Sequence, residues 1–143
     1  MAPSRDDILR FLRGHSLAAQ ASVSLADSPQ ASAVGFIVTD DFEMFFDALD
    51  TARKIQNLRQ NPKIAFVIGG LQEGEERTVQ YEGFAEEPRG DVLARLQEQY
   101  FARFPEGRER QSWPGITYVR VRPRWLRFSD FSQRPPEIVE FVF

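Results

Sequence analysis

Short polar turns separate apolar segments of the chain, and this spacing is the strongest constraint on its fold. Residues 17–25 alternate with a period of two, which predicts a strand with one buried, apolar face. The turn at 26–30 contains Asp, Ser and Pro, and further strands are predicted at 31–38 and 43–48, joined by the turn at 39–41. Strands joined by such short turns run antiparallel, so the first part of the chain predicts a meander.

Three further strands are predicted downstream. Residues 63–70 are apolar on both faces, so this strand should be central in a sheet. Residues 77–87 alternate again, and a last strand covers 116–128. Pro123 cannot donate a ladder hydrogen bond, and it therefore predicts an edge or a bulge in the middle of that strand.

Three short helices complete the prediction. Ser4 and Asp7 form a capping-box pattern, and Gly14 ends the first helix. Thr51 is the expected N-cap of a second helix, which Asn61-Pro62 stops. Pro88 suits the first turn of a third helix, whose apolar side carries Val92, Leu93, Leu96 and Tyr100.

Together these elements predict a mainly β fold with short helices, in a single domain over residues 1–143. Hairpins dominate the six strands, and the βαβ alternation of a parallel sheet is missing. A small antiparallel barrel, closed or partly closed, is the expected architecture. The thirteen phenylalanines can fill its interior or an interface.

Composition excludes several classes of function. The chain has no cysteine, which removes disulfides and thiolate chemistry, and its one histidine excludes a histidine-rich metal site. His15 follows Gly14, and we expect it to cap the end of the first helix. At a net charge of −3, without a long basic stripe, nucleic-acid binding is not expected. No apolar run spans a membrane and no secretory signal begins the chain, so we expect a cytoplasmic protein.

One segment of this acidic chain contains no carboxylate. Residues 51–72 lack Asp and Glu, whereas Arg53 and Lys54 lie side by side in the first turn of the predicted second helix. The helix dipole disfavours exposed cations there by about 0.3–1 kcal/mol each. A bound anion such as a phosphate monoester would reverse that sign. The alternative is a solvated basic patch paired with Asp47 or Asp50.

Three segments of the sequence resemble the pyridoxamine 5′-phosphate oxidase-like family of FMN-binding split barrels. The first is MFFDALDTARKIQNLRQNPKIAFVIG at 44–69, with its Thr-x-Arg-Lys turn followed by Asn-Leu and Asn-Pro. The second is RTVQYEGFAE at 77–86, and the third is WPGITYVRVRPRWLRFSD at 113–130. The resemblance extends from about Ile8 to Asp130 and implies a six-stranded antiparallel split barrel.

The resemblance also implies an FMN site. Its residues would be Ser32, Ala33, Val34, Gly35, Asp47, Ala48, Thr51, Arg53, Lys54, Thr78 and Gln80. Arg53 and Lys54 would hold the phosphate, while the backbone at 32–36 would run along the flavin ring. Small residues in that strand suit close approach of a flat ring, although tight packing under the helices explains them equally.

The resemblance further implies a homodimer with flavin sites at the subunit interface. The apolar tail at 131–143 is expected to pack across the partner. We expect a flavin-dependent oxidoreductase acting on a small molecule, with a nicotinamide nucleotide as a candidate electron donor. Ser32 and Thr78 stand where authentic pyridoxamine phosphate oxidases have Arg and Gln, and the tail lacks their Arg-x-His segment, so a different reaction is expected.

Other functions remain open at this point. The protein could store flavin or sense redox state without catalysis, or the scaffold could hold deazaflavin or haem, for which His15 is the only imidazole. The arginines of the last strand leave two alternatives, since they either pair with acids or face an anionic ligand. They are Arg120, Arg122, Arg124 and Arg127.

Overall fold

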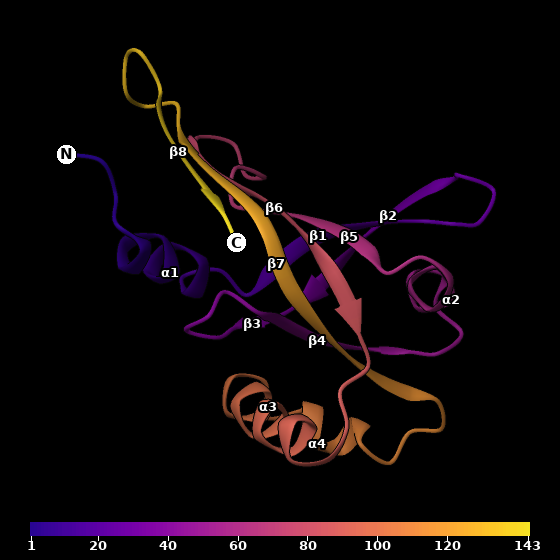
Figure 1. The fold of residues 1–143 in the computed structure, drawn as a ribbon. Helices are drawn as coiled ribbons and strands as arrows, with labels where there is room; N and C mark the ends of the chain where they lie inside the picture. Colours follow the sequence, from indigo (N-terminus) through magenta and orange to yellow (C-terminus); the bar gives the residue numbers. More distant parts are fainter.

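Antiparallel strand pairing organises the whole chain. The computed structural model describes residues 1–143, and it contains eight strands and four helices (Figure 1). In chain order they are α1 (Arg5–Arg13), β1 (Leu17–Val23), β2 (Pro29–Gly35), β3 (Ile37–Val38), β4 (Met44–Leu49), α2 (Arg53–Gln60), β5 (Lys63–Ile68), β6 (Arg77–Glu86), α3 (Gly90–Arg103), α4 (Gly107–Arg110), β7 (Ile116–Asp130) and β8 (Glu137–Val142).

The strands form one curled sheet in the order β2-β1-β5-β6-β7-β4-β3, and β8 also pairs with β7. The long strand β7 makes the curl, because it pairs with β4 along its first part and with β6 and β8 along its second (Figure 1). β2 and β3 are the free ends of the sheet, so the barrel stays open. The predicted mainly β, antiparallel split-barrel class is confirmed, and β5 is central as expected.

The strand count differs from the predicted six for two reasons. The predicted strand at 31–38 divides at Phe36, where the chain leaves β1 and turns toward β4. The apolar tail forms β8 on β7 of its own chain, with Val139 and Phe141 packed on the core. Four apolar side chains of the tail stay exposed, so its packing on a partner remains a prediction for Phe131, Ile138, Val142 and Phe143.

A bulge lies where Pro123 predicted one. The register between β6 and β7 shifts at Glu82/Gly83, and Gly83 pairs with Pro123. A Cβ on Gly83 would come within 2.3 Å of the Arg122 carbonyl oxygen. Only glycine allows the two strands to approach this closely.

The helices begin and end close to the predicted positions, with two corrections. The capping box of α1 is present, since Ser4 Oγ accepts from the Asp7 amide and the Asp7 carboxylate accepts from the Ser4 amide. Thr51 is not the N-cap of α2, because the Leu49–Ala52 turn delays the helix and places Ala52 there. Pro88 precedes α3, whose N-cap is Arg89.

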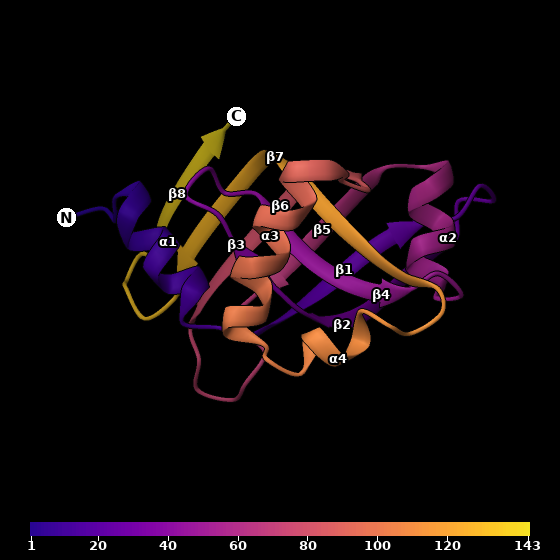
Figure 2. The same ribbon diagram turned by 90° about the horizontal axis from the view of Figure 1, so that it is seen from below.

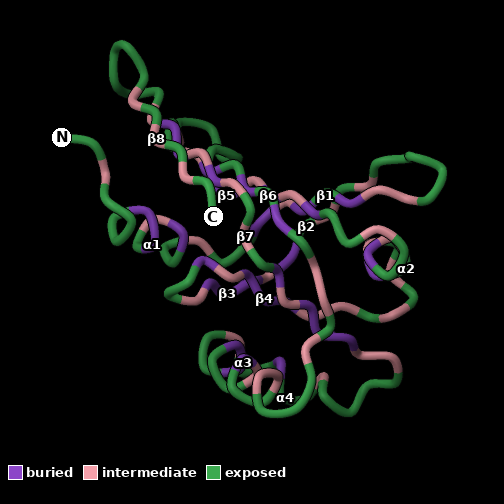
Figure 3. The backbone as a smooth tube through the Cα atoms, viewed as in Figure 1, coloured by how far each residue is buried: buried purple, intermediate pink, exposed green.

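Two apolar clusters hold these elements together. The main core fills the inside of the curled sheet, under α1 and α2, and it is rich in phenylalanine. A smaller cluster lies on the other side of β4, where Phe45 and Tyr118 pack against Leu96 and Tyr100 of α3. Figure 2 shows α3 lying over this side of the sheet, and Figure 3 shows the buried segments where these elements meet.

The burial of β1 is the reverse of the prediction. Its polar face is inside, with Gln20 0% and Ser22 1% exposed, whereas Leu17 is 60% exposed. The reason is that α2 covers the polar face and supplies hydrogen-bond partners to it. The apolar face of β1 therefore points outward, beside Ala31 of β2 and Ala65 and Val67 of β5, and no helix covers it.

Tyr81 gives a test of how the core is held. Its hydroxyl donates to the Phe42 carbonyl oxygen at 2.6 Å, and Phe42 has a positive φ of 62°. We expect Tyr81→Phe to lower the free energy of unfolding by about 1–2 kcal/mol, because it leaves a buried carbonyl without this donor. Urea denaturation measures the difference.

Tyr118→Phe is the matched control for this prediction. The Tyr118 hydroxyl is buried without a hydrogen-bond partner, so its removal is expected to leave stability unchanged or to raise it slightly. Equal losses in the two variants would contradict the role assigned to the Tyr81 hydrogen bond.

Candidate functional site

A polar cluster lies between α2 and the inner face of β1 and β2. Ser32 Oγ accepts from Gln20 Nε2 at 2.8 Å and from Lys54 Nζ at 3.2 Å. Asn57 of α2 donates to Ser22 of β1 at 3.3 Å. Gln20 Oε1 is buried without a partner, and the Ser32 hydroxyl makes no hydrogen bond as a donor. The cluster therefore retains unused polar capacity.

Lys54 is a partly buried cation without an acidic partner. Neither Lys54 nor Arg53 takes part in a salt bridge, so the predicted alternative of pairing with Asp47 or Asp50 is not realised. Burial lowers the pKa of the Lys54 ammonium. A bound anion would compensate this desolvation.

The first turn of α2 adds backbone donors to these side chains. No side chain caps the helix, and its first turn contains no acidic residue. The amides of Arg53 and Lys54 have no acceptor, because the backbone bonds at this end begin with Ile55 donating to Ala52. The amides of Arg53 and Lys54 and the Ser32 hydroxyl thus have no acceptor, and the Lys54 ammonium has only the Ser32 oxygen.

The free edge of β2 passes Ser32. Ser24 donates to Ser28 and Phe36 donates to Ser16, so even-numbered residues of this hairpin pair with β1. The N–H and C=O groups of Ala31, Ala33 and Gly35 consequently point to the open side of the barrel. This edge offers alternating donors and acceptors to a heterocycle.

Other predicted site residues lie elsewhere in the subunit. The Asp47 carboxylate points to α3 and α4, where it accepts from Arg110 Nε and the Tyr100 hydroxyl, each at 3.0 Å. Burial, followed by the Asp47 charge, raises the pKa of Tyr100. Ala48 packs against the main core and Val34 is buried in it, so both contribute backbone only.

The remaining predicted residues lie at the surface or on the outer face. Thr51 and Ala33 are exposed, and Gly35 lies against the Phe104 ring. Thr78 Oγ1 donates to the Gly69 carbonyl oxygen at 2.9 Å, and Gln80 lines a hollow on the outer face of the sheet. A single subunit therefore gathers Ser32, Arg53 and Lys54 but not Thr78 and Gln80.

Gln20 and Asn57 are the residues that the sequence prediction missed. The signal was present, because Gln20 and Ser22 place polar side chains at alternate positions among the alanines of β1. The apolar positions were assigned to the buried face instead.

The arginines of β7 are mostly paired with acids. Arg120 binds Glu43 and Glu86, Arg122 binds Glu86, and Arg127 binds Glu140. Arg124 lies over the Phe84 ring at 5.8 Å. Of the two predicted alternatives, the structure supports ion pairing.

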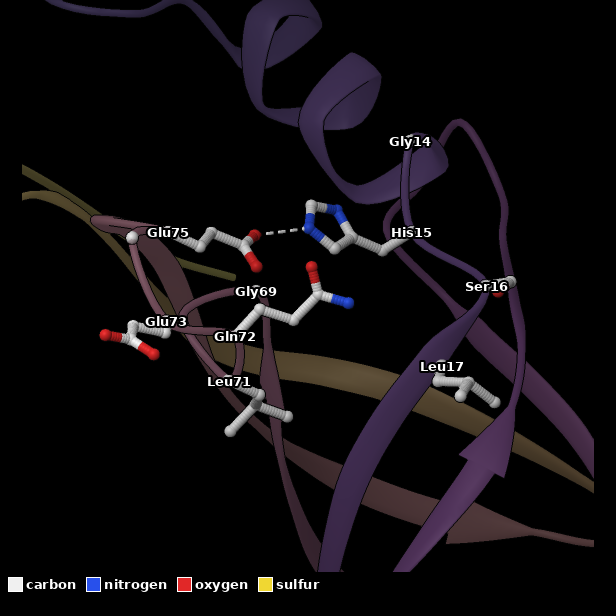
Figure 4. A pocket seen from close by; sticks show the side chains of 10 residues that line it. Gly14, His15, Ser16, Leu17, Gly69, Leu71, Gln72, Glu73 and Glu75 are labelled. Carbon is white, nitrogen blue, oxygen red and sulfur yellow. Dashed lines mark hydrogen bonds and ion pairs between the residues drawn. The ribbon is translucent and has the colours of Figure 1, made fainter.

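His15 is fully engaged by its own chain. Its Nδ1 faces the Phe11 carbonyl oxygen at 2.8 Å, which confirms the predicted capping of α1, and its Nε2 faces Glu75 Oε1 at 2.6 Å (Figure 4). No group of three or more metal-ligating side chains forms in the structure. None of the helices is long and apolar enough to cross a membrane.

The open antiparallel barrel, with a cation-bearing helix beside a free strand edge, is a split barrel. The sequence matches the family model described as pyridoxamine 5′-phosphate oxidase over residues 4–130. The chain belongs to this family, which confirms the predicted resemblance. No curated protein matches the sequence.

Solved structures share this fold at low sequence identity. A haem-binding protein from Mycobacterium smegmatis superposes with a TM-score of 0.83 at 17% identity, covering 99% of this chain and 59% of that protein. The haem storage protein HutZ from Vibrio cholerae gives 0.76 at 17%, covering 99% and 95%. A putative pyridoxamine 5′-phosphate oxidase from Listeria innocua gives 0.67 at 20%, covering 87% and 96%. This chain thus spans little more than half of the Mycobacterium protein.

Lys54 provides a direct test of the anion site. The chain has only two lysines, so Lys63→Arg leaves Lys54 as the single lysine. We expect Lys54 in this variant to titrate below the ordinary range for lysine, because burial lowers its pKa. NMR of ¹³C-methylated lysine measures the titration. Inorganic phosphate should raise the pKa again, and a titration insensitive to phosphate would contradict anion binding here.

Proposed function

We propose that this protein binds FMN and serves as a flavin-dependent oxidoreductase for a small molecule. The observation that carries the proposal is Lys54, a partly buried cation with no acidic partner at the uncapped start of α2. A phosphate group would supply the anionic partner that the Lys54 ammonium lacks, and the acceptor that the two free amides and the Ser32 hydroxyl lack. Arg53, exposed beside them, would add a second charge.

The flavin ring would lie along the free edge of β2. Main-chain N–H and C=O groups at Ala33 and Gly35 can pair with the carbonyl and imide groups of the ring. The bound flavin would supply hydride or electron transfer, while the protein orients the ring and shapes access to it. The substrate and the electron donor are not specified by these residues, and a nicotinamide nucleotide remains the candidate donor.

A double substitution tests the phosphate contacts. We expect Arg53→Ala with Lys54→Ala to weaken FMN binding by about a hundredfold or more, since each lost charge-assisted hydrogen bond costs about 1.5–3 kcal/mol. Flavin fluorescence quenching measures the affinity, and circular dichroism checks the fold.

Lys63→Ala is the matched control, because it removes the other lysine of the chain from the exposed start of β5. Its affinity for FMN should equal that of the natural protein. If the double variant also kept that affinity, the phosphate would have to bind elsewhere.

Haem is the second candidate cofactor, and the comparisons favour it. Two of the similar structures are haem proteins by their descriptions, whereas none of the three is described as a flavoprotein. The residues of this chain fit haem poorly. Both nitrogens of its single imidazole face oxygen acceptors, and the hydroxyls of Tyr81 and Tyr100 are hydrogen-bonded. The third tyrosine hydroxyl, that of Tyr118, has no partner but is buried.

Absorption spectra separate the two cofactors. We expect the gently purified protein to show a flavin spectrum, or to take up added FMN, and to form no stoichiometric complex with hemin. A stoichiometric Soret band that disappears in His15→Ala would replace the flavin proposal with haem binding. A deazaflavin differs from FMN in the same spectrum, and bound flavin that no nicotinamide nucleotide reduces would favour flavin storage or redox sensing.

We also propose that the protein is a homodimer that buries the outer face of its sheet. This face exposes the apolar side of β1 and holds a hollow of about 290 Å³ lined by Ala19, Ala21, Ala31, Ala65, Val67 and Trp125, beside Gln80. Val142 of β8 lies next to Trp125 on the same face. Uncovered apolar surface of this kind is costly in water. A partner here would bring Gln80 into an interface.

A single charge on this face tests the dimer. Ala21→Asp should produce monomers in sedimentation velocity, because it buries an unpaired carboxylate in the proposed interface. Ala94→Asp, on the exposed surface of α3, is the matched control and should sediment like the natural protein. A natural protein that sediments as a monomer at micromolar concentration would contradict the proposal.

A further inference from the structure

The single histidine connects two parts of the chain that lie far apart in sequence. His15 follows the C-cap of α1, whereas Glu75 lies in the loop between β5 and β6. Figure 4 shows the imidazole and the carboxylate meeting across the space between the helix end and this loop. Both side chains are about three-quarters buried.

The protonation state of His15 decides how many of its contacts can form. The Phe11 carbonyl oxygen can only accept a hydrogen bond, and the ionised Glu75 carboxylate can only accept as well. A neutral imidazole has one N–H donor and therefore satisfies one of the two. The imidazolium has two donors and satisfies both, and the carboxyl end of α1 also favours its charge.

The charged groups around His15 come from four elements. Glu73 and Glu75 belong to the β5–β6 loop, and Arg77 of β6 lies over the Phe11 ring at 5.5 Å. Arg103 of α3 donates to the His15 carbonyl oxygen at 2.9 Å, and Arg13 is on α1 itself. Of these charged groups, only Glu75 bonds to the imidazole ring.

Gly69 makes the contact sterically possible. It has a φ of 76°, and a Cβ there would come within 2.6 Å of the Phe11 ring and 2.9 Å of Glu75 Oε1. Phe11 of α1 and Glu75 of the loop therefore both occupy space that a side chain at position 69 would need.

The other end of α1 is attached in a way that does not titrate. The Arg5 guanidinium lies 4.8 Å from the Phe141 ring, 5.1 Å from the Phe143 ring and 5.9 Å from the Phe42 ring, and it has no acidic partner. Such cation–π contacts are independent of pH in the neutral range. The two ends of the helix are thus held by different chemistry.

We propose that His15 and Glu75 form a protonation-dependent latch that holds the carboxyl end of α1 against the β5–β6 loop. The latch is closed when His15 is an imidazolium and Glu75 a carboxylate, and it loosens when the imidazole loses its proton, because the neutral ring donates to only one of the two acceptors. The hydrogen bond from His15 lowers the pKa of Glu75, so acid opens the latch only below the ordinary range of a glutamate. The closed state therefore requires a protonated imidazole together with an ionised Glu75.

Opening the latch would alter two cavities. His15 lines a cavity of about 600 Å³ under the β5–β6 loop and a second one of about 370 Å³ between α1, β3 and α3. Because the imidazole lines both cavities, its release would change access to each of them. This inference does not depend on which cofactor the protein binds.

Hydrogen exchange of α1 amides tests the latch. We expect protection factors at Ile8–Leu12, corrected for intrinsic exchange, to fall roughly three- to tenfold between pH 6.0 and pH 8.5. Amides of α2 should show no such change. His15→Gln and Glu75→Gln should each give lower protection at pH 6.0 and a flat profile, since neither pair can form the ionic contact.

Arg5→Gln is the matched control on the same helix. It should lower the protection of α1 by the same factor at both pH values and keep the natural dependence on pH. Equal protection of the natural protein at the two pH values would overturn the proposal. Persistence of the pH dependence in both His15→Gln and Glu75→Gln would overturn it as well.

Discussion

The hydrogen bonds between α2 and the inner face of β1 and β2 determine which face of β1 is buried. Gln20, Ser22 and Ser32 can lie inside the barrel because each finds a polar partner there, two of them on the helix. Once the polar face of β1 is inside, its apolar face must be outside. The candidate anion site and the uncovered outer face therefore have one cause.

The sequence predicted the class of fold well, because that class rests on local signals. The capping box at Ser4 and the bulge at Pro123 both appear in the structure. Each depends on residues that are close in sequence or paired across one ladder. The helix starts at Thr51 and Pro88 were misplaced by one or two residues, and for α2 the reason is the Leu49–Ala52 turn that precedes it.

The orientation of β1 could not be predicted in the same way. A period of two shows that a strand has two different faces, but a nearby helix can make the polar face the buried one. Asn57 and Lys54 provide those partners from another element. At the candidate site Lys54 donates to Ser32, whereas Asp47 is bound by Tyr100 of α3 and Arg110 of α4, segments to which the prediction gave no such role.

The free edge of β2 has a consequence for handling the protein. An unpaired strand edge built from small, uncharged residues can accept a strand from another chain. Pro29 protects only the start of β2, and Ala31 and Ala33 offer neither a charge nor a proline to prevent this. A ligand bound in the opening of the barrel, as proposed for FMN, would also shield that edge. Loss of such a ligand would then promote self-association of the protein, and light scattering would report whether the site is occupied.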